Sequence, residues 1–277
     1  QGMVASVDAL ATRVGVDILR QGGNAVDAAV AVGYALAVTH PQAGNIGGGG
    51  FMMLRTKDGK TTAIDFREMA PEQATRDMFL DDQGNPDSKK SLTSHLASGT
   101  PGSVAGFSLA MEKYGTMPLN KVIRPAIKLA EEGFIVNDAL ADDLKTYGSE
   151  VIPQHENSKA IFWKNGEPLK KGDRLVQKNL GKSLELIAEH GPEAFYKGAI
   201  ADQIADEMKK HGGLITKADL ASYKAVERTP VSGEYRGYEV YSMPPPSSGG
   251  IHIVQILNIL ENFDMQKYGF GSADAMQ

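Results

Sequence analysis

The 277-residue sequence contains no cysteine. Disulfide frameworks, thiolate zinc sites, iron–sulfur clusters and cysteine nucleophiles are therefore excluded, and any catalysis must use oxygen or nitrogen groups. An excess of positive charge is also missing, because 29 Lys and Arg residues stand against 34 Asp and Glu residues, for a formal net charge of -5. Such a balance lacks the electrostatic footprint of nucleic-acid binding, and we expect no nucleic-acid partner.

Long apolar runs are absent as well. The most apolar stretch, residues 28–38, is much shorter than the roughly 20 residues that a transmembrane helix needs, so we predict no membrane span. The first residues have neither the basic nor the apolar segment of a signal peptide, so any such leader has been removed or lies upstream. A chain of this length without thiols fits an oxidising compartment such as a bacterial periplasm.

The apolar residues that are present, 42% of the total, are enough to build a core. Their spacing predicts two N-terminal helices, with Ser6 as the cap of the first and Asn24 as the cap of the second. Residues 51–56 and 61–67 then form a hairpin, an α-rich middle follows at about 101–223, and strands and a helix come last. This order predicts a layered α/β or α+β fold.

The glycine-rich segment at residues 44–50 does not match a nucleotide-binding loop. It lacks the G-x-G-x-x-G spacing, and it leads into a predicted strand, whereas a phosphate site needs a helix N-terminus. Two interpretations remain open for it. The glycines serve close packing of the backbone, or they let a substrate approach the backbone.

The sequence contains no local motif for a metal site or for a catalytic serine. The histidines show no H-E-x-x-H pattern and no accompanying carboxylate cluster, so the sequence predicts no metal site and no cofactor. They are His40, His95, His155, His190, His211 and His252. The G-x-S-x-G elbow and the S-x-x-K pair are also missing, although a triad assembled from distant residues would leave no such trace.

Arg67 is the strongest single candidate for function. If residues 61–67 alternate as a strand, Arg67 shares a face with Asp65 while Phe66 points to the more apolar side. Taken alone, an arginine in this position is more often a solvated or ion-paired residue than a ligand-binding one. A second candidate is the segment 247–250, which places hydroxyls and amides where a helix begins; plain capping is the favoured interpretation there.

Four separated segments, in the same order along essentially the whole chain, resemble the gamma-glutamyltranspeptidases. They are residues 22–28 (GGNAVDA), 40–50 (HPQAGNIGGGG), 65–71 (DFREMAP) and 244–250 (PPPSSGG). The resemblance is closest to the large subunit of the bacterial periplasmic enzymes. Since residues 1–277 also stop inside a predicted helix that starts at Ser272, we expect them to be a partial large subunit.

The resemblance implies an N-terminal-nucleophile hydrolase whose αββα sandwich is shared with a small subunit cut from the same precursor. The nucleophilic Thr begins that small subunit, so no catalytic residue is expected in this chain and the small subunit is its expected partner. Arg67, in the motif of residues 65–68, is the implied substrate-binding residue. Its guanidinium suits bidentate binding of the α-carboxylate of a γ-glutamyl substrate such as glutathione.

The implied activity, present only with the small subunit, is cleavage of γ-glutamyl amide bonds through a γ-glutamyl ester, which passes to water or to an amino acid or peptide acceptor. Within the same family, a glutaryl or cephalosporin acylase and a poly-γ-glutamate depolymerase are alternatives. From another class, an acidic chain without metal or triad also fits a periplasmic solute-binding protein, which would bind reversibly without turnover.

Overall fold

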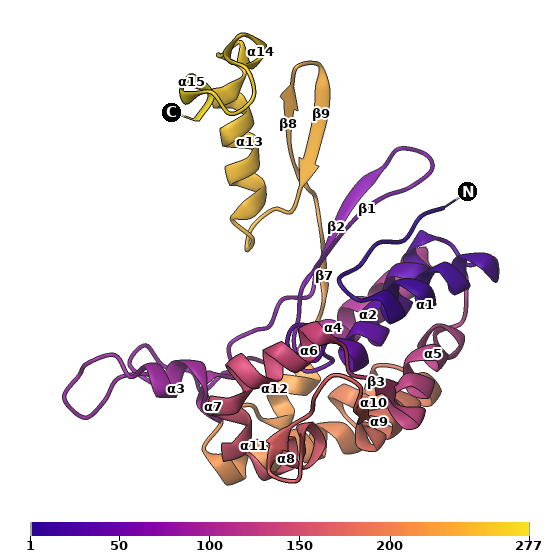
Figure 1. The fold of residues 1–277 in the computed structure, drawn as a ribbon, viewed down its shortest axis with the longest axis vertical. Coiled ribbons are helices and arrows are strands. Elements are labelled where there is room, and N and C mark those ends of the chain that lie inside the picture. Colours follow the sequence, from indigo (N-terminus) through magenta and orange to yellow (C-terminus); the bar gives the residue numbers. More distant parts are fainter. Residues whose placement is uncertain (1, 277) are drawn as a thin grey trace. The chain divides into compact units, whose positions relative to one another are not determined.

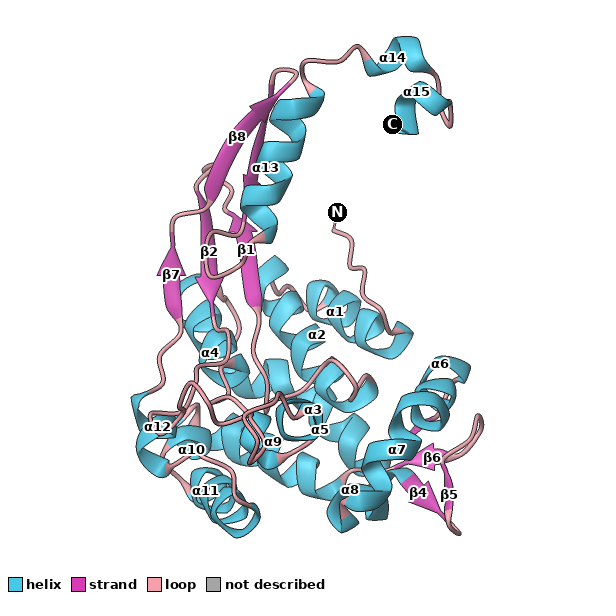
Figure 2. Cartoon of the chain, turned by 90° about the vertical axis from the view of Figure 1, so that its left-hand side faces the viewer, coloured by secondary structure: helices cyan, strands magenta, loops and turns pink. Residues whose placement is uncertain are grey.

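The computed structural model describes residues 2–276. They divide into two compact units: the larger comprises residues up to Gly50 together with Phe66–Lys224, and the smaller comprises Phe51–Asp65 and the residues from Ala225 onward. Figure 1 follows the chain, and Figure 2 distinguishes its helices from its strands. The predicted mixture of helix and strand is confirmed. Within residues 2–276, no helix combines the length and the apolar character required to cross a bilayer.

The first helix, α1 (Ala9–Arg20), begins later than predicted. Its N-cap is Asp8, whose carboxylate accepts a hydrogen bond of 2.9 Å from the Ala11 amide. The Ser6 hydroxyl instead donates to the Asp8 carbonyl at 2.9 Å. The prediction of Ser6 as the cap is therefore wrong, because a carboxylate next to the first turn satisfies the free amides and also complements the positive end of the helix dipole.

The second helix, α2 (Ala25–Thr39), has the predicted cap. The side-chain oxygen of Asn24 accepts hydrogen bonds from the amides of Val26 and Asp27, and the Asp27 carboxylate accepts one from the Asn24 amide, which completes a capping box. The helix is buried on nearly all sides and packs against α1, α4 and α5. It is the central helix of the larger unit.

The rest of the larger unit is mainly helical, with short strand pairs between helices. The helices after α2 are α3 (Ser88–Leu92), α4 (Ser103–Tyr114), α5 (Leu119–Glu132), α6 (Asp138–Asp143), α7 (Ser149–Val151), α8 (Glu156–Phe162), α9 (Lys178–His190), α10 (Glu193–Tyr196), α11 (Ala199–His211) and α12 (Lys217–Ser222), with single turns η1 (His95–Ala97), η2 (Leu144–Gly148) and η3 (Ile152–Gln154). Strand β3 (Phe134–Ile135) pairs with β6 (Arg174–Leu175), and β4 (Trp163–Lys164) pairs with β5 (Glu167–Pro168).

The smaller unit contains most of the regular strand structure. Strands β1 (Phe51–Arg55), β2 (Thr61–Asp65) and β7 (Val226–Arg228) form an antiparallel sheet in the order β1-β2-β7. A hairpin of β8 (Val231–Tyr235) and β9 (Tyr238–Ser242) packs against α13 (Gly249–Leu260), and α14 (Met265–Tyr268) and α15 (Ala273–Met276) follow. The hairpin turns at Arg236 and Gly237, both with positive φ, as a two-residue connection requires.

Strand β2 departs from the prediction at its end. The strand stops at Asp65 and does not include Arg67. It also lacks the expected alternation, since Ala63 and Ile64 are fully buried and Asp65 is only 8% exposed. The carboxylate of Asp65 is paired with Arg228, whose Nε lies 2.8 Å away. Asp65 therefore does not share an exposed face with Arg67, because both faces of β2 are covered.

Candidate substrate-binding site

Arg67 lines an open pocket of about 480 Å³ in the larger unit. Its side chain is exposed, whereas Phe66 before it is only 5% exposed and anchors the segment. The pocket is lined by Asn45, Gly47, Gly48, Arg67, Glu68, Met69, Ala70, Ala97, Ser98 and Gly99. The structure thus brings the predicted arginine and the predicted glycine-rich segment together in one place.

The glycine-rich segment packs directly against the backbone of the arginine motif. Gly50 and Phe66 exchange backbone hydrogen bonds of 3.2 and 3.0 Å. A Cβ added at Gly49 would lie 2.5 Å from the Phe66 carbonyl oxygen and 2.7 Å from the Glu68 amide nitrogen, closer than any side chain permits. Close backbone packing, one of the two interpretations left open by the sequence, is therefore what Gly49 provides, while Gly47 and Gly48 line the pocket itself.

Helix α4 holds the same segment from another side. The carbonyl oxygen of Gly48 accepts hydrogen bonds from the amides of Gly102 and Ser103, at 2.7 and 2.9 Å. These are amides at the start of α4, which have no partner inside the helix. The first amides of α4 thus fix the glycine-rich segment.

Tyr223 fixes the backbone of Arg67 itself. Its hydroxyl donates a hydrogen bond of 2.8 Å to the Arg67 carbonyl oxygen, and its ring stacks on Tyr196 with centroids 5.7 Å apart. The Tyr196 hydroxyl in turn donates to the Pro101 carbonyl at 2.9 Å, and burial raises the pKa of Tyr196 far above its usual value. The Tyr196 phenol is therefore a neutral donor at physiological pH, and together the two tyrosines hold the backbone that carries Arg67.

Sequence reasoning missed Tyr223 and Gly102. A Cβ on Gly102 would lie 2.0 Å from the Phe66 carbonyl oxygen and 2.1 Å from the Tyr223 hydroxyl, so only glycine fits between them. Both residues are far from Arg67 in the sequence, and neither belongs to a motif with a spacing rule. A local pattern could not have revealed them.

A second part of the pocket lining is the segment around Ser98 and Gly99. Met69 and Thr100 exchange backbone hydrogen bonds of 3.2 and 2.7 Å, which hold this segment beside the arginine motif. Among the described lining residues, Ser98 carries the hydroxyl, and no histidine or lysine accompanies it. The pocket therefore offers a guanidinium for a carboxylate but no Ser–His or Ser–Lys pair.

The second sequence candidate, segment 247–250, is described within the smaller unit. Helix α13 begins at Gly249, and the residue at its cap position, Ser248, makes no side-chain capping hydrogen bond. The Ser247 hydroxyl accepts a long hydrogen bond of 3.4 Å from the Gly249 amide. Side-chain capping by Ser248 is thus not observed.

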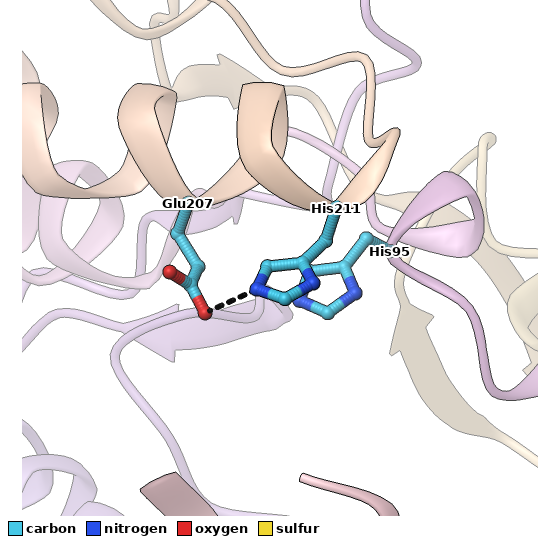
Figure 3. Close-up of side chains that lie close together, drawn as sticks. All are labelled: His95, Glu207 and His211. Carbon is cyan, nitrogen blue, oxygen red and sulfur yellow. Dashed lines mark ion pairs between the residues drawn. The ribbon is translucent and has the colours of Figure 1, made fainter. Parts of the chain in front are cut away.

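The sequence positions of the histidines suggested that they are separate, but three of them are neighbours in the fold. His95, His155 and His211 lie together in the larger unit, and His211 is 3.3 Å from the carboxylate of Glu207 (Figure 3). Burial lowers the pKa of His95, the neighbouring imidazoles of His211 and His155 lower it further, and Glu207 opposes them. One carboxylate, that of Glu207, therefore accompanies these histidines, although the sequence shows no metal-binding motif around them. Glu207 and His211 are four residues apart, so their pairing follows from local helix spacing, whereas the contacts of His95 with His211 and His155 arise only in the tertiary fold.

The fold belongs to the class of the N-terminal-nucleophile hydrolases, as the solved structures that the chain matches show. The chain superposes on the crystal structure of gamma-glutamyltranspeptidase from Helicobacter pylori with a TM-score of 0.97 and 49% identity, covering 99% of this chain and 79% of that one. A model of the gamma-glutamyltranspeptidase family matches residues 11–277. The chain belongs to the gamma-glutamyltranspeptidase family.

Curated relatives agree with this assignment. The chain is 85% identical to the glutathione hydrolase proenzyme of Escherichia coli K12 over all of its own length and 48% of that protein. It is 41% identical to an acylase ACY 1 proenzyme of Pseudomonas strain V22, again over all of this chain and 50% of the relative. The chain thus spans about half the length of these relatives, which are proenzymes. Membership of the family excludes the solute-binding protein that composition alone had allowed.

Proposed function

We propose that this chain is part of the large subunit of a glutathione hydrolase with γ-glutamyltransferase activity, in which Arg67 binds the α-carboxylate of the γ-glutamyl group. The observation that carries the proposal is the exposed Arg67 side chain at an open pocket, presented from a backbone that Gly49 and Tyr223 hold in place. The similarity to a glutathione hydrolase proenzyme supports the substrate class.

In the proposed reaction, the N-terminal Thr of the small subunit supplies the nucleophile. Its hydroxyl oxygen attacks the γ-amide carbonyl, its own α-amino group accepts the hydroxyl proton, and the amine leaves with that proton as the γ-glutamyl ester forms. Water, or the amino group of an amino acid or peptide, then cleaves the ester and regenerates the Thr. Backbone amides stabilise the tetrahedral oxyanion. Arg67 contributes by orienting the γ-glutamyl group through two parallel hydrogen bonds to its α-carboxylate.

The test is the kinetics of Arg67→Ala in the full-length protein with a γ-glutamyl anilide. Loss of a charged partner from a desolvated carboxylate is expected to cost about 2–5 kcal/mol of transition-state binding, roughly a 30-fold to several-thousand-fold drop in kcat/KM. Arg67→Lys should recover only part of this, because an ammonium cannot form the bidentate pair. Arg76→Ala is the matched control, since the Arg76 side chain is 95% exposed and is not among the residues that line the pocket. An unchanged kcat/KM for Arg67→Ala refutes the carboxylate-binding role.

The similarity to an acylase proenzyme favours a second candidate, hydrolysis of glutaryl amides such as cephalosporin side chains. A glutaryl group keeps the terminal carboxylate that Arg67 would bind but has no α-amino group. The two functions are therefore distinguished by the ratio of kcat/KM values for matched γ-glutamyl and glutaryl anilides. A ratio well above one supports the glutathione hydrolase, and a ratio below one supports the acylase.

Two further parts of the proposal concern the context of the chain. The proenzyme character of its relatives supports a small subunit of the same precursor as its partner. The absence of cysteine supports an oxidising compartment, the bacterial periplasm. Mass spectrometry of the purified native protein and fractionation of the cells test these two points, and a single unprocessed polypeptide or a cytoplasmic fraction would contradict them.

A further inference from the structure

A cluster of imidazole and carboxylate groups lies outside the lining of the Arg67 pocket. Glu207 and His211 are one turn apart at the end of α11, with Nε2 of His211 3.3 Å from Oε1 of Glu207. His95, from the turn η1, stacks on His211 with ring centroids 4.7 Å apart and planes at 15°. Figure 3 shows the two rings stacked with the Glu207 carboxylate beside them. His155 meets His95 edge-on, at 5.6 Å between centroids.

The donor atoms of three of these residues are close enough to share one ion. One ligand atom each from His95, Glu207 and His211 lies within 4.8 Å of the other two. Donors bound at about 2.0–2.1 Å to a tetrahedral ion are roughly 3.3 Å from each other. Each donor therefore needs to move by little more than an ångström, a displacement that side-chain rotation provides, since all three side chains are only partly buried or exposed.

The backbone already holds the two donor segments together. Helix α11 ends at Gly212, which is left-handed with φ 74°, and the next residue, Gly213, rests against His95. A Cβ at Gly213 would lie 3.0 Å from the His95 carbonyl oxygen and 3.2 Å from the His95 Cβ. On the other segment, the Ser94 hydroxyl caps η1 by accepting a hydrogen bond from the Leu96 amide at 3.2 Å. The two backbone segments that carry the ligands are thus held together by contacts that do not require an ion.

We propose that His95, Glu207 and His211 form a binding site for a divalent transition-metal ion of the zinc, copper or nickel class. Two imidazoles and one carboxylate are donors that such ions prefer, whereas calcium and magnesium select sites built from oxygen alone. A pair of ligands one helical turn apart plus a third from another segment leaves a coordination position open, and His155 lies beside the ligand His95.

A metal at this site would affect the Arg67 pocket indirectly. The segment that starts at His95 continues through Ala97, Ser98 and Gly99, which line that pocket. Coordination would cross-link this wall to α11. The inference does not rest on the proposed function, because metal binding is measured without any substrate.

The experiment is a calorimetric titration with Zn²⁺. It uses the untagged full-length protein after treatment with a chelator. We expect one equivalent of tight binding, and an affinity at least about 10-fold weaker in His95→Ala and in His211→Ala. His190→Ala is the matched control, because His190 is an exposed histidine that also has a carboxylate nearby, Glu189 at 3.8 Å, but has no second imidazole beside it among the described ring contacts. Its Zn²⁺ affinity should equal that of the wild type.

A second, spectroscopic measurement distinguishes the loss of a metal ligand from unfolding of the variant. Co²⁺ bound to the wild type should give visible d–d absorption bands, which should disappear in Glu207→Gln, a substitution that preserves side-chain shape and removes the charge. Circular dichroism of each variant confirms that it is folded. Zn²⁺ affinity that is the same in the wild type and in all three cluster variants, or no Zn²⁺ binding by the wild type, overturns the proposal.

Discussion

Two buried carboxylates illustrate how single residues organise this chain. Asp27 is fully buried, and besides completing the cap of α2 it accepts hydrogen bonds from the amides of Thr116 and Met117, at 2.9 and 3.1 Å. Asp219 caps α12 together with Thr216 and accepts a hydrogen bond of 2.7 Å from the Glu72 amide. Each acid thus satisfies a helix start and, at the same time, a loop distant in the sequence. We therefore expect Asp27 and Asp219 to contribute more to the free energy of unfolding than a residue that only caps a helix.

Asp27→Ala should destabilise the protein strongly. The substitution leaves the amides of Asn24, Thr116 and Met117 without their acceptor in a buried site, which we expect to cost about 3 kcal/mol or more. Asp17→Ala is the control, because the Asp17 side chain forms an exposed ion pair with Arg20 and its loss should change stability by less than about 0.5 kcal/mol. Urea unfolding of the full-length variants measures both, and equal stabilities would contradict the role given to Asp27.

Asp219 should make stability fall in acid. Burial alone raises the pKa of Asp219, but the hydrogen bonds donated by the Thr216 hydroxyl and by the amides of Glu72 and Thr216 outweigh it and bring the pKa below its usual value. A carboxylate with a lowered folded-state pKa stabilises the fold above its unfolded pKa of about 3.9, and that contribution is lost as pH falls below this value. The free energy of unfolding of Asp219→Asn, measured from about pH 3 to about pH 7, should therefore depend less on pH than that of the wild type. Identical slopes would exclude this contribution.

At the scale of elements, the arginine pocket depends on backbone segments that touch without side chains between them. Gly49 lies against the carbonyl of Phe66, Gly102 lies between that carbonyl and Tyr223, and a Cβ at Gly106 would be 2.2 Å from the Phe66 ring. Helix α4 approaches the motif through glycines because any larger residue would separate them. The position of Arg67 is thus a consequence of how closely α4, the glycine-rich loop and the backbone at Phe66 can pack.

Gly49→Ala tests this packing, and Gly47→Ala is a control from the same loop. The added methyl group at Gly49 would meet backbone atoms at 2.5 and 2.7 Å, whereas at Gly47 the nearest group, the Asn45 side-chain oxygen, is 3.8 Å away. Neither glycine has a positive φ, so the comparison isolates contact from backbone strain. We expect a loss of about 1–3 kcal/mol for Gly49→Ala and less than about 0.5 kcal/mol for Gly47→Ala. Thermal and urea unfolding measure the difference; a Gly49→Ala protein as stable as Gly47→Ala would count against close packing.

At the scale of the whole molecule, the chain leaves apolar surface uncovered. On α13 of the smaller unit, Ile253, Ile256 and Ile259 are 46%, 55% and 60% exposed. Side chains of this kind, gathered on one helix, are typical of a surface that another protein segment covers. The relatives that this chain matches are about twice its length, and the proposed small subunit would belong to the remaining half.

The chain expressed alone should therefore be inactive and should expose apolar surface. We expect no turnover of a γ-glutamyl anilide by residues 1–277, because the proposed nucleophile is absent, and stronger binding of a hydrophobic dye than by the full-length protein. The full-length protein measured in parallel is the control. Turnover by the chain alone would refute the proposed division of roles between the subunits.

Local features of the fold were accessible from the sequence wherever neighbouring residues determine the structure. The Asn24 cap was predicted correctly, since it depends on a side chain that bonds to amides two and three residues further along the chain. The family was also recognisable, because four motifs in a fixed order are specific together. The Ser6 cap failed because Asp8 competes successfully for the same role.

Only the tertiary structure decided the surroundings of the candidate site. That both faces of β2 are covered, that Tyr223 holds the Arg67 carbonyl, and that His95 stacks on His211 all depend on residues distant in the chain. A sequence by itself determines propensities, caps and turns, because these are interactions between near neighbours. Which distant groups meet is determined by the packing of whole elements, where burial and backbone contact outweigh any local preference.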